Sequence, residues 1–294
     1  MPEGMIIKAL SGFYYVTDGN RQVRCRARGV FRKRHVVPLV GDHVTYEAKK
    51  ATEGYILSVG QRSTMLNRPP IANVDQAVLV FSVAEPAFDD QLLDRFLVHM
   101  EAHRIPSLIC LTKWDLLDAG GDEAMRKLMA RYTKIGYPVI RTSSVKNLGL
   151  ADLRKHLEGM INVITGQSGV GKSSLLNGLD HSLSIDTQEI SQSLGRGKHT
   201  TRHVELLPIA AGGFVADTPG FSSLEIPPLS PGELEQCFPE FSEFRTLCRF
   251  RGCTHFAEPG CAVKKAVKEH LIDVNRYAHY QAFSQEIGKR KRRY

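Results

Sequence analysis

The stretch Gly166-Gln167-Ser168-Gly169-Val170-Gly171-Lys172-Ser173 decides the fold of this chain. The apolar run 160–165 before it predicts a buried strand, and residues 172–179 after it predict a helix. A glycine-rich loop between a strand and a helix, ending in Lys-Ser, is the context of a phosphate-binding P-loop. The glycines let the backbone wrap around a phosphate, and the helix N-terminus points its positive dipole end at the anion. A glycine-rich turn without a ligand gives no reason for the Lys-Ser pair, so we predict a nucleotide site.

The roles within this loop follow from the chemistry of phosphoryl transfer. We expect Lys172 to bridge the β- and γ-phosphates and the Ser173 hydroxyl to bind Mg²⁺. Backbone amides of the loop and of the first helical turn are expected to hold the other phosphate oxygens. The predicted phosphate-binding residues are Gly166, Gln167, Ser168, Gly169, Val170, Gly171, Lys172, Ser173 and Ser174.

Two further motifs, each after a predicted strand, indicate the base. One follows the apolar run 107–111, and its Asp115 can accept two hydrogen bonds from the N1 and N2 donors of guanine. Its Lys113 can lie across the base plane. The other follows 138–141, where backbone can meet the guanine carbonyl. The predicted guanine-binding residues are Thr112, Lys113, Trp114, Asp115, Ser143 and Ser144.

A third motif, Asp217-Thr-Pro-Gly220, follows the run 213–216 and offers a carboxylate for the Mg²⁺ shell and a glycine amide for the γ-phosphate. Between it and the P-loop helix, residues 180–202 show little apolar periodicity, which favours either a functional loop or surface disorder. The position is that of a switch I segment. Thr200 or Thr201 would complete the Mg²⁺ shell when a γ-phosphate is present, and spacing alone does not separate the two.

The motif order is unusual, because the two base-reading motifs precede the P-loop and the Asp-x-x-Gly motif. Joining the old termini of a domain and cutting it elsewhere preserves its sheet. In these motifs and their order, essentially the whole chain resembles the circularly permuted GTPases, specifically the RsgA family of bacterial small ribosomal subunit biogenesis GTPases. One departure is Thr112, which stands where the family usually has an Asn that pins the loop and contacts the base.

The resemblance implies an enzyme that hydrolyses GTP to GDP and phosphate, with Mg²⁺, and that binds the small ribosomal subunit and its rRNA late in maturation. It also implies that Thr201, with Ser173 and Asp217, is the threonine of the Mg²⁺ shell. Two other functions stay open: a GTPase with another RNA target or a membrane target, and an RNA-binding assembly factor that uses GTP as a structural ligand.

Catalysis requires a group that orients the attacking water. Many GTPases place Gln directly after Asp-x-x-Gly, but here that residue is Phe221, which cannot form hydrogen bonds. The nearest polar candidate is His199, beside the switch threonines; an exposed loop histidine, an RNA contact, or a ribosomal group in its place are the alternatives. The predicted catalytic residues are therefore His199, Thr201 and Lys172.

Length and composition are those of an ordinary globular protein of two or three domains, with 294 residues, 42% hydrophobic and 24% charged. No apolar run approaches the length of a membrane span, and the first ten residues lack the features of a secretory signal. We therefore expect a cytoplasmic monomer that makes no membrane contact. The net charge of +8 is uneven: it is +6 over 1–65, −2 over 66–225 and +4 over 226–294. Basic flanks around a nearly neutral centre favour a polyanionic partner.

Residues 1–65 predict five short strands and no helix, which indicates an OB-fold barrel. Arg24, Arg26 and Arg28 alternate and so share one strand face, and Arg32-Lys33-Arg34 is expected in the next loop. We interpret these side chains as an RNA-binding surface, with a merely solvated basic face as the alternative. A polar link, 61–70, is expected to lead into the next domain.

Residues 66–225 alternate between strand and helix patterns, with a break at Gly120-Gly121 before a helix near 123–134, and predict an α/β GTPase domain around a parallel sheet. Residues 226–294 are expected to form a small α-helical domain that binds zinc, because Cys248-x₄-Cys253-x-His255-x₅-Cys261 has the ligand types of a structural Zn²⁺ site. Free buried thiols are the alternative. The tail 288–294 is expected to be a disordered basic arm.

Overall fold

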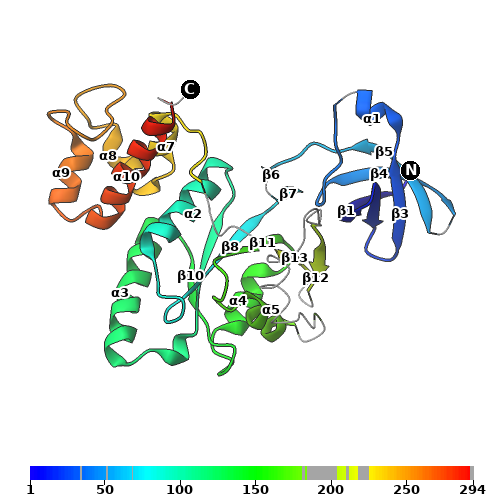
Figure 1. The fold of residues 1–294 in the computed structure, drawn as a ribbon, viewed down its shortest axis with the longest axis horizontal. Coiled ribbons are helices and arrows are strands. Elements are labelled where there is room, and N and C mark those ends of the chain that lie inside the picture. Colours follow the sequence, from blue (N-terminus) through cyan, green and yellow to red (C-terminus); the bar gives the residue numbers. More distant parts are fainter. Residues whose placement is uncertain are drawn as a thin grey trace.

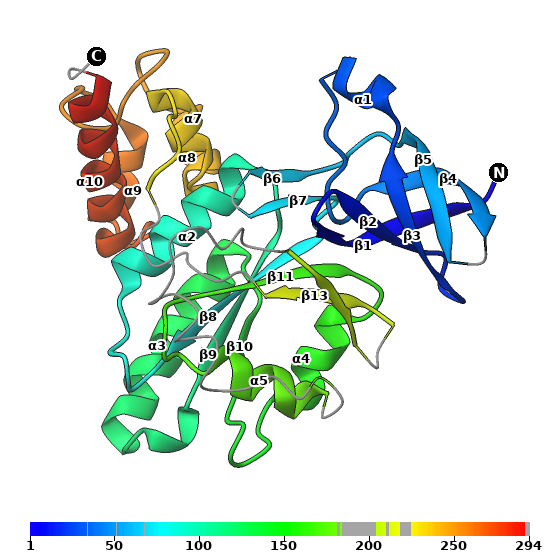
Figure 2. The same cartoon turned by 45° about the vertical axis from the view of Figure 1, so that its right-hand side comes forward.

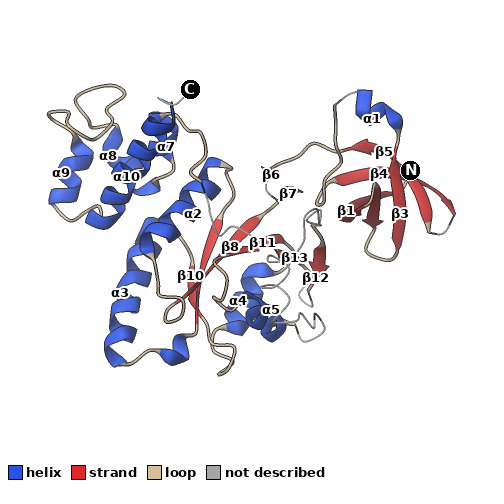
Figure 3. Ribbon diagram, in the orientation of Figure 1, coloured by secondary structure: helices blue, strands red, loops and turns tan. Residues whose placement is uncertain are grey.

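The computed structural model describes residues 1–33, 35–50, 52–67, 69–180, 183, 204–209, 212–217 and 225–291; for Arg32, Lys49, Lys50, Asp217 and Lys291 only the backbone is described. Figure 1 shows a barrel, a central sheet flanked by helices, and a helical C-terminal part. Figure 3 shows that the C-terminal part consists of helices and loops, while strands make up most of the barrel. The predicted fold class is confirmed in its α/β centre, its N-terminal barrel and its helical C-terminal part.

Alternation of apolar and polar residues builds the barrel, since buried side chains such as Ile6, Val16, Val23, Tyr46 and Ile56 fill its interior. The strands close in the order β1-β2-β3-β5-β4, in which β3 and β5 pair in parallel. Their bounds are β1 Glu3–Leu10, β2 Phe13–Thr17, β3 Gln22–Ala27, β4 His43–Lys50 and β5 Glu53–Val59.

One expectation around the barrel was wrong, and one segment has more structure than its sequence indicates. A short helix, α1 (Gly29–Lys33), follows β3 where the end of a strand and then a loop were predicted. The link 61–70 forms most of a two-stranded sheet, β6 (Met65–Asn67) and β7 (Pro70–Ala72), between the barrel and the central sheet (Figure 2). The barrel turn at Gly41 packs directly on β7, because the Ala72 amide donates to Val40 O at 2.9 Å. A Cβ at Gly41, whose φ is +87°, would collide with Ala72 O, so only glycine permits this contact.

The central sheet has the order β10-β9-β8-β11-β13-β12, parallel except for the edge strand β12. The chain enters at β8 in the middle of the sheet, runs outward through β9 and β10, and returns to β11 on the other side of β8. The gap between the carboxyl ends of β8 and β11 is therefore a topological switch point, where open α/β sheets bind ligands. The bounds are β8 Gln76–Ser82, β9 Ser107–Thr112, β10 Val139–Arg141, β11 Ile161–Thr165, β12 Leu206–Pro208 and β13 Phe214–Asp217.

Helices cover both faces of this sheet (Figures 1 and 2). On one face α2 (Asp90–Ala102) and α3 (Ala119–Ile135) bury side chains such as Phe96 and Tyr132. On the other, α4 (Leu150–Leu157) and α5 (Lys172–Leu179) bury a separate leucine-rich cluster. The break expected at Gly120-Gly121 is wrong: both residues lie in the first turn of α3, because the Asp118 carboxylate caps it by accepting from the Gly121 amide at 2.7 Å.

The C-terminal part surrounds an aromatic core in which Phe238, Phe241 and Tyr280 contact one another edge-on or stacked. Its elements are α7 Pro231–Gln236, the short helix η4 Pro239–Phe241, α8 Ser242–Arg245, α9 Ala262–Lys268 and α10 Val274–Lys291. The disordered arm expected from residue 288 is wrong for 288–291, which continue α10. Arg290 explains why, since it pairs with Glu286 one turn earlier and donates to Ile226 O at 2.9 Å.

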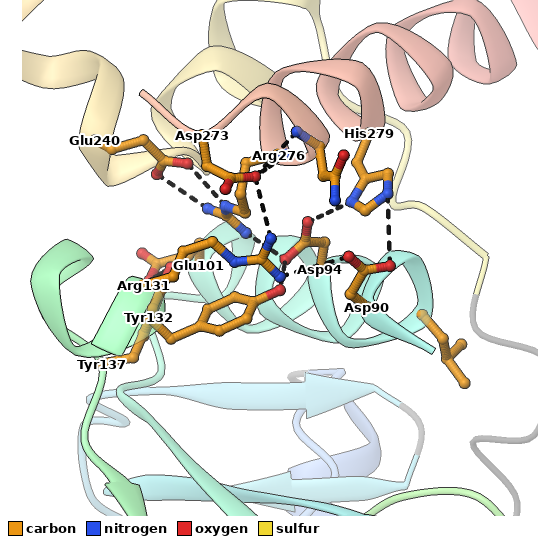
Figure 4. A network of polar contacts seen from close by, with 12 residues as sticks. Asp90, Asp94, Glu101, Arg131, Tyr132, Tyr137, Glu240, Asp273, Arg276 and His279 are labelled. Carbon is orange, nitrogen blue, oxygen red and sulfur yellow. Dashed lines mark hydrogen bonds and ion pairs between the residues drawn. The ribbon is translucent and has the colours of Figure 1, made fainter. Parts of the chain in front are cut away.

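A buried network of charged side chains joins α10 to α2 and α3 (Figure 4). Arg276 is fully buried; its guanidinium donates to Asp94 at 2.6 Å and to both oxygens of Glu240 at 2.7 and 2.9 Å. Tyr132 and His279 also contact Asp94, at 2.7 and 2.6 Å. Burial alone would raise the pKa of Asp94, but the nearby Arg276, with hydrogen bonds from these partners, outweighs it and lowers that pKa. The helical part is thus held to the central domain by paired charges.

None of the helices that the structure describes has both the length and the apolar character needed to cross a membrane.

Candidate nucleotide site and metal centre

The predicted P-loop lies between β11 and α5, at the switch point of the sheet. Gly166, Gly169 and Gly171 have φ values of 156°, 80° and 93°, a region that side chains with a Cβ rarely adopt. A Cβ at Gly166 would also collide with the carbonyl oxygen of Val80, two residues before the end of β8. The loop therefore requires these glycines for its shape as well as for its approach to the neighbouring strand.

Lys172 is buried in this loop with 7% of its surface exposed. Its ammonium donates to Gly166 O at 2.9 Å and to Gln167 O at 2.7 Å. A buried ammonium is costly unless it meets polar or anionic groups, and the two carbonyls hold it at the mouth of the loop. Ser173 is also buried, whereas Ser168 and Ser174 are exposed, so the first two residues of α5 are the enclosed pair.

The loop that follows β9 is fastened directly to the P-loop. The buried Thr112 hydroxyl donates to Val170 O at 2.6 Å and lies 3.2 Å from Phe81 O, the neighbouring strand's carbonyl. Lys113 adopts a left-handed conformation with φ of 60°, and its ammonium donates to Glu85 O. The sequence predicts a role for Thr112 and Lys113 but not for Glu85, because Glu85 contributes only its backbone carbonyl, which any residue could offer.

Trp114 ties the two base-reading motifs together. Its amide donates to Thr142 O at 3.1 Å, and its indole donates to Asp122 on α3 at 2.8 Å. Beside it, Asp115 is half-buried, and within the described ranges its carboxylate has no hydrogen bond or ion pair. A carboxylate that is held at this edge of the sheet and has no partner among the described residues can accept hydrogen bonds from the N–H donors of a base.

The remaining predicted residues fall into two groups. Ser143 is buried and forms an isolated antiparallel β-bridge with Leu148, while Ser144 is half-buried. Asp217 ends β13 in register with Ile164 of β11, which places its backbone beside the start of the P-loop. His199, Thr200, Thr201, Gly220 and Phe221 lie outside the described residues.

Far from this edge, Cys248, Cys253, His255 and Cys261 bring their ligand atoms within 4.8 Å of one another. His255 Nδ1 lies 3.7 Å from Cys248 Sγ and 3.3 Å from Cys261 Sγ, and the two sulfurs are 3.9 Å apart. Metal–sulfur bonds of about 2.3 Å at tetrahedral angles place two sulfurs roughly 3.8 Å apart, so the spacing suits one tetrahedral ion. The group can therefore hold a metal ion.

Two family models match the chain: that of the RsgA N-terminal domain over residues 3–56, and that of the RsgA GTPase over residues 59–227. The second spans more than half of the 294 residues.

The chain belongs to the RsgA GTPase family.

Relatives of known family match this chain over its full length. The small ribosomal subunit biogenesis GTPases RsgA of Shouchella clausii (strain KSM-K16) and Geobacillus kaustophilus (strain HTA426) are 54% and 55% identical over 294 residues, which cover 100% of this chain and of each relative. The crystal structure of YloQ, a circularly permuted GTPase, superposes with a TM-score of 0.84 at 48% identity, over 99% of this chain and 96% of that one. The structure of YjeQ from Thermotoga maritima gives 0.86 at 34% identity, over 97% and 98%.

Membership of the RsgA GTPase family confirms the resemblance found in the sequence, the permuted order of the motifs, and GTP hydrolysis as the activity. The permuted order is visible in the sheet. The strands of the base-reading half, β8 to β10, precede β11 and its P-loop along the chain, yet β8 lies directly beside β11 in the sheet, so the two halves are neighbours in space.

The chemistry around the Cys-His group of this RsgA GTPase also fits a cation. Burial raises the pKa of the Cys253 thiol to about 12 and raises that of Cys261, so a metal ion that binds there has to displace the thiol protons. The ring nitrogen of His255 that faces away from the sulfurs is fully enclosed, has no hydrogen bond to any described residue, and lies 3.5 Å from a carboxylate oxygen of Glu235. A carboxylate behind a histidine ligand orients the ring in many metal sites.

The barrel arginines are less free than the sequence indicates. Arg24 and Arg26 are exposed on the face of β3 opposite Val23 and Cys25, whereas Arg28 is exposed just beyond the strand, which ends at Ala27. Arg24 pairs with Glu53, and Arg28 pairs with Glu47 at 2.9 Å. The guanidinium of Arg26 stacks on Phe13 at 4.6 Å and has no acidic partner among the residues described here.

Proposed function

We propose that this GTPase binds GTP at the carboxyl edge of β8, β9 and β11 and acts on the small ribosomal subunit during its late maturation. One observation carries the proposal: Thr112 and Trp114 fasten the guanine motifs to the P-loop and to each other through buried hydrogen bonds. Such bonds give a base-reading carboxylate and a phosphate cradle a fixed separation, which a nucleotide requires.

Within this proposal, the P-loop from Gly166 to Ser174 holds the phosphates, and Ser173 with Asp217 and Thr201 holds Mg²⁺. The residues of 112–115 with Ser143 and Ser144 hold guanine, while Gly220 donates to the γ-phosphate. His199 positions the attacking water, since Phe221 cannot. The sequence motifs support these last roles.

The two flanks serve the RNA. We propose a barrel domain 1–65, a GTPase domain 66–225 and a C-terminal domain 226–294, in which Zn²⁺ has a structural role because four protein ligands leave no open position. The names of the relatives support the small subunit as the partner, and the basic charge of both flanks supports contact with its rRNA. The protein would work as a monomer in the cytoplasm, without contact to a membrane.

Cosedimentation with purified small subunits, over a series of salt concentrations, tests the proposal. Replacing Arg24, Arg26 and Arg28 with Ala should lower the slope of log affinity against log salt by up to about 3, because each phosphate contact releases a counterion. Arg21→Ala, which removes an exposed arginine already paired with Asp18, is the matched control. No binding of the native protein to small subunits at low salt would refute the proposed target.

A further inference from the structure

The C-terminal domain carries an open groove of about 660 Å³ between α8 and α9. Figure 1 places both helices at the end of the molecule furthest from the barrel. The apolar lining comes from Phe244 of α8 and Leu247 just after it, and from Ala257 and Pro259 in the loop before α9. Leu247 is 70% exposed, although it borders a domain with a well-filled aromatic core. A single exposed aliphatic side chain is ordinary on a protein surface, but Leu247 adjoins the other apolar residues of this groove, and together they offer a contact surface to a partner.

Lysines of α9 form one side of this groove. Lys264 and Lys268 are four residues apart and therefore share one helix face. In the part of the chain that the structure describes, neither ammonium has an acidic partner, whereas Lys265 between them pairs with Glu269 at 3.7 Å. Two free cations beside an apolar floor complement a partner that presents carboxylates next to aliphatic side chains.

A second depression of the same domain has a different chemistry. It measures about 380 Å³ and is lined by Arg245, Arg249, Phe250 and Arg251. Arg249 stacks over Phe250 at 5.6 Å, a combination that suits RNA bases and phosphates. The metal group separates the two sites, since Cys261 lines the α8–α9 groove while Cys248, Cys253 and His255 line the other.

The α8–α9 groove suits RNA poorly by comparison. Its cations are lysines rather than arginines, its aromatic ring, that of Phe244, is half-buried, and the carboxylates of Glu258 and Glu269 also line it. Glu258 is fixed there by hydrogen bonds from the amides of Thr254 and Phe256 at 2.7 and 2.9 Å. Glu269 already pairs with Lys265, whereas the fixed carboxylate of Glu258 repels any anion close to it and can accept hydrogen bonds from the amide groups of a peptide.

We propose that the α8–α9 groove binds a protein segment of the small ribosomal subunit that carries aliphatic side chains and two carboxylates. The carboxylates would pair with Lys264 and Lys268, and an aliphatic side chain would cover Leu247. This inference rests on the proposed function, because it takes the small subunit as the source of the partner.

The test places a photoreactive benzophenone amino acid at position 247 or at position 250 of the full-length protein, in complex with purified small subunits. We expect position 247 to crosslink to a ribosomal protein, within an acidic segment identified by mass spectrometry, and position 250 to crosslink to rRNA. Leu247→Asp, and separately Lys264→Glu with Lys268→Glu, should weaken cosedimentation about fivefold to tenfold. Lys127→Glu, on the exposed face of α3, is the control for added negative charge. Unchanged metal content and GTP binding would show that the variants fold.

The outcomes separate this inference from the proposed function. If the native protein cosediments but position 247 crosslinks to rRNA or to nothing, the peptide groove is wrong and the proposed function stands. If both groove variants cosediment with small subunits as well as the native protein does, the proposed peptide-binding groove is also wrong. If the native protein does not bind small subunits at all, the proposed function fails and this inference fails with it.

Discussion

The choice of guanine rests on the carboxylate of Asp115, which forms no hydrogen bond or ion pair with any described side chain. Asp115→Asn replaces one of its acceptor oxygens with a donor and mismatches the N1 and N2 donors of guanine. Losing a charged hydrogen-bond partner costs about 1.5–3 kcal/mol, so the affinity for GTP should fall at least about tenfold and preference should shift towards xanthine nucleotides. Trp114 is the one tryptophan of the chain, so its fluorescence reports the binding. The exposed Asp152→Asn is the control, and equal affinity of the native protein for GTP and ATP would contradict the assignment.

Thr112 shows how a smaller side chain can replace an asparagine. Its hydroxyl has one proton, and the short distance to Val170 O assigns that proton to the P-loop rather than to Phe81 O. Thr112→Val keeps the shape but leaves a buried carbonyl without its donor, at a cost of about 1–3 kcal/mol. We expect GDP and GTP affinities to fall by about fivefold or more in a binding titration, with recovery in Thr112→Asn. Thr133→Val, at an exposed position, is the control and should bind both nucleotides like the native protein. If Thr112→Val also binds them with native affinity, the hydrogen bond to Val170 does not contribute to nucleotide binding.

At the scale of the elements, the segment 248–261 has its four candidate ligands close together but only a short helix after it. Cys253→Ala should remove metal from the purified protein, because three ligands hold zinc far less well than four. Metal analysis should find about one Zn²⁺ per chain in the native protein and in Cys237→Ala, which removes a buried thiol outside the group. GTP binding should survive in both variants. Native protein purified without chelators yet free of zinc would disprove the metal site.

The elements that a sequence reading predicts best are those whose periodicity is long, such as the barrel strands, α2, and the strand and helix around the P-loop. The misses come from elements too short to show a pattern and from contacts between residues far apart in the chain. β6 and β7 are three residues each, and Pro70 stands at a strand's start, so neither shows an alternating pattern. The last turn of α10 has the composition of a disordered tail, and what orders it includes Ile226 O, 64 residues away. The pairing of Arg24 with Glu53 is equally non-local and has no signature in either strand alone.

Across the whole molecule, Arg276 joins the C-terminal domain to the GTPase domain (Figure 4). Arg276→Met would leave Asp94 and Glu240 buried without their cation. Removing one partner of a buried ion pair costs about 3–5 kcal/mol, so we expect a markedly lower unfolding midpoint in urea. Lys127→Met, which removes an exposed cation, should change the midpoint little. An Arg276→Met variant as stable as the native protein would show that the network does not join the domains.

The same network predicts a dependence on pH. Because the pKa of Asp94 is lowered below 3.8 by folding, its stabilising contribution is present above that value and is lost as pH falls through the folded-state pKa. Without Arg276, the pKa of Asp94 would be higher than in the native protein, because burial would then be opposed only by the hydrogen bonds from His279 and Tyr132. The stability difference between the native protein and Arg276→Met should therefore narrow as pH falls from 7 towards 4, and a constant difference would contradict this.

The most direct measurement is the rate of GTP hydrolysis with and without purified small ribosomal subunits. We predict slow turnover by the protein alone, since Phe221 occupies the position of the usual water-orienting Gln. Small subunits should raise that rate, and His199→Ala should remove most of the increase while nucleotide affinity holds. Stimulation that persists in His199→Ala would move the water-orienting role elsewhere. A rate that small subunits leave unchanged in the native protein would contradict a GTPase that acts on the small ribosomal subunit.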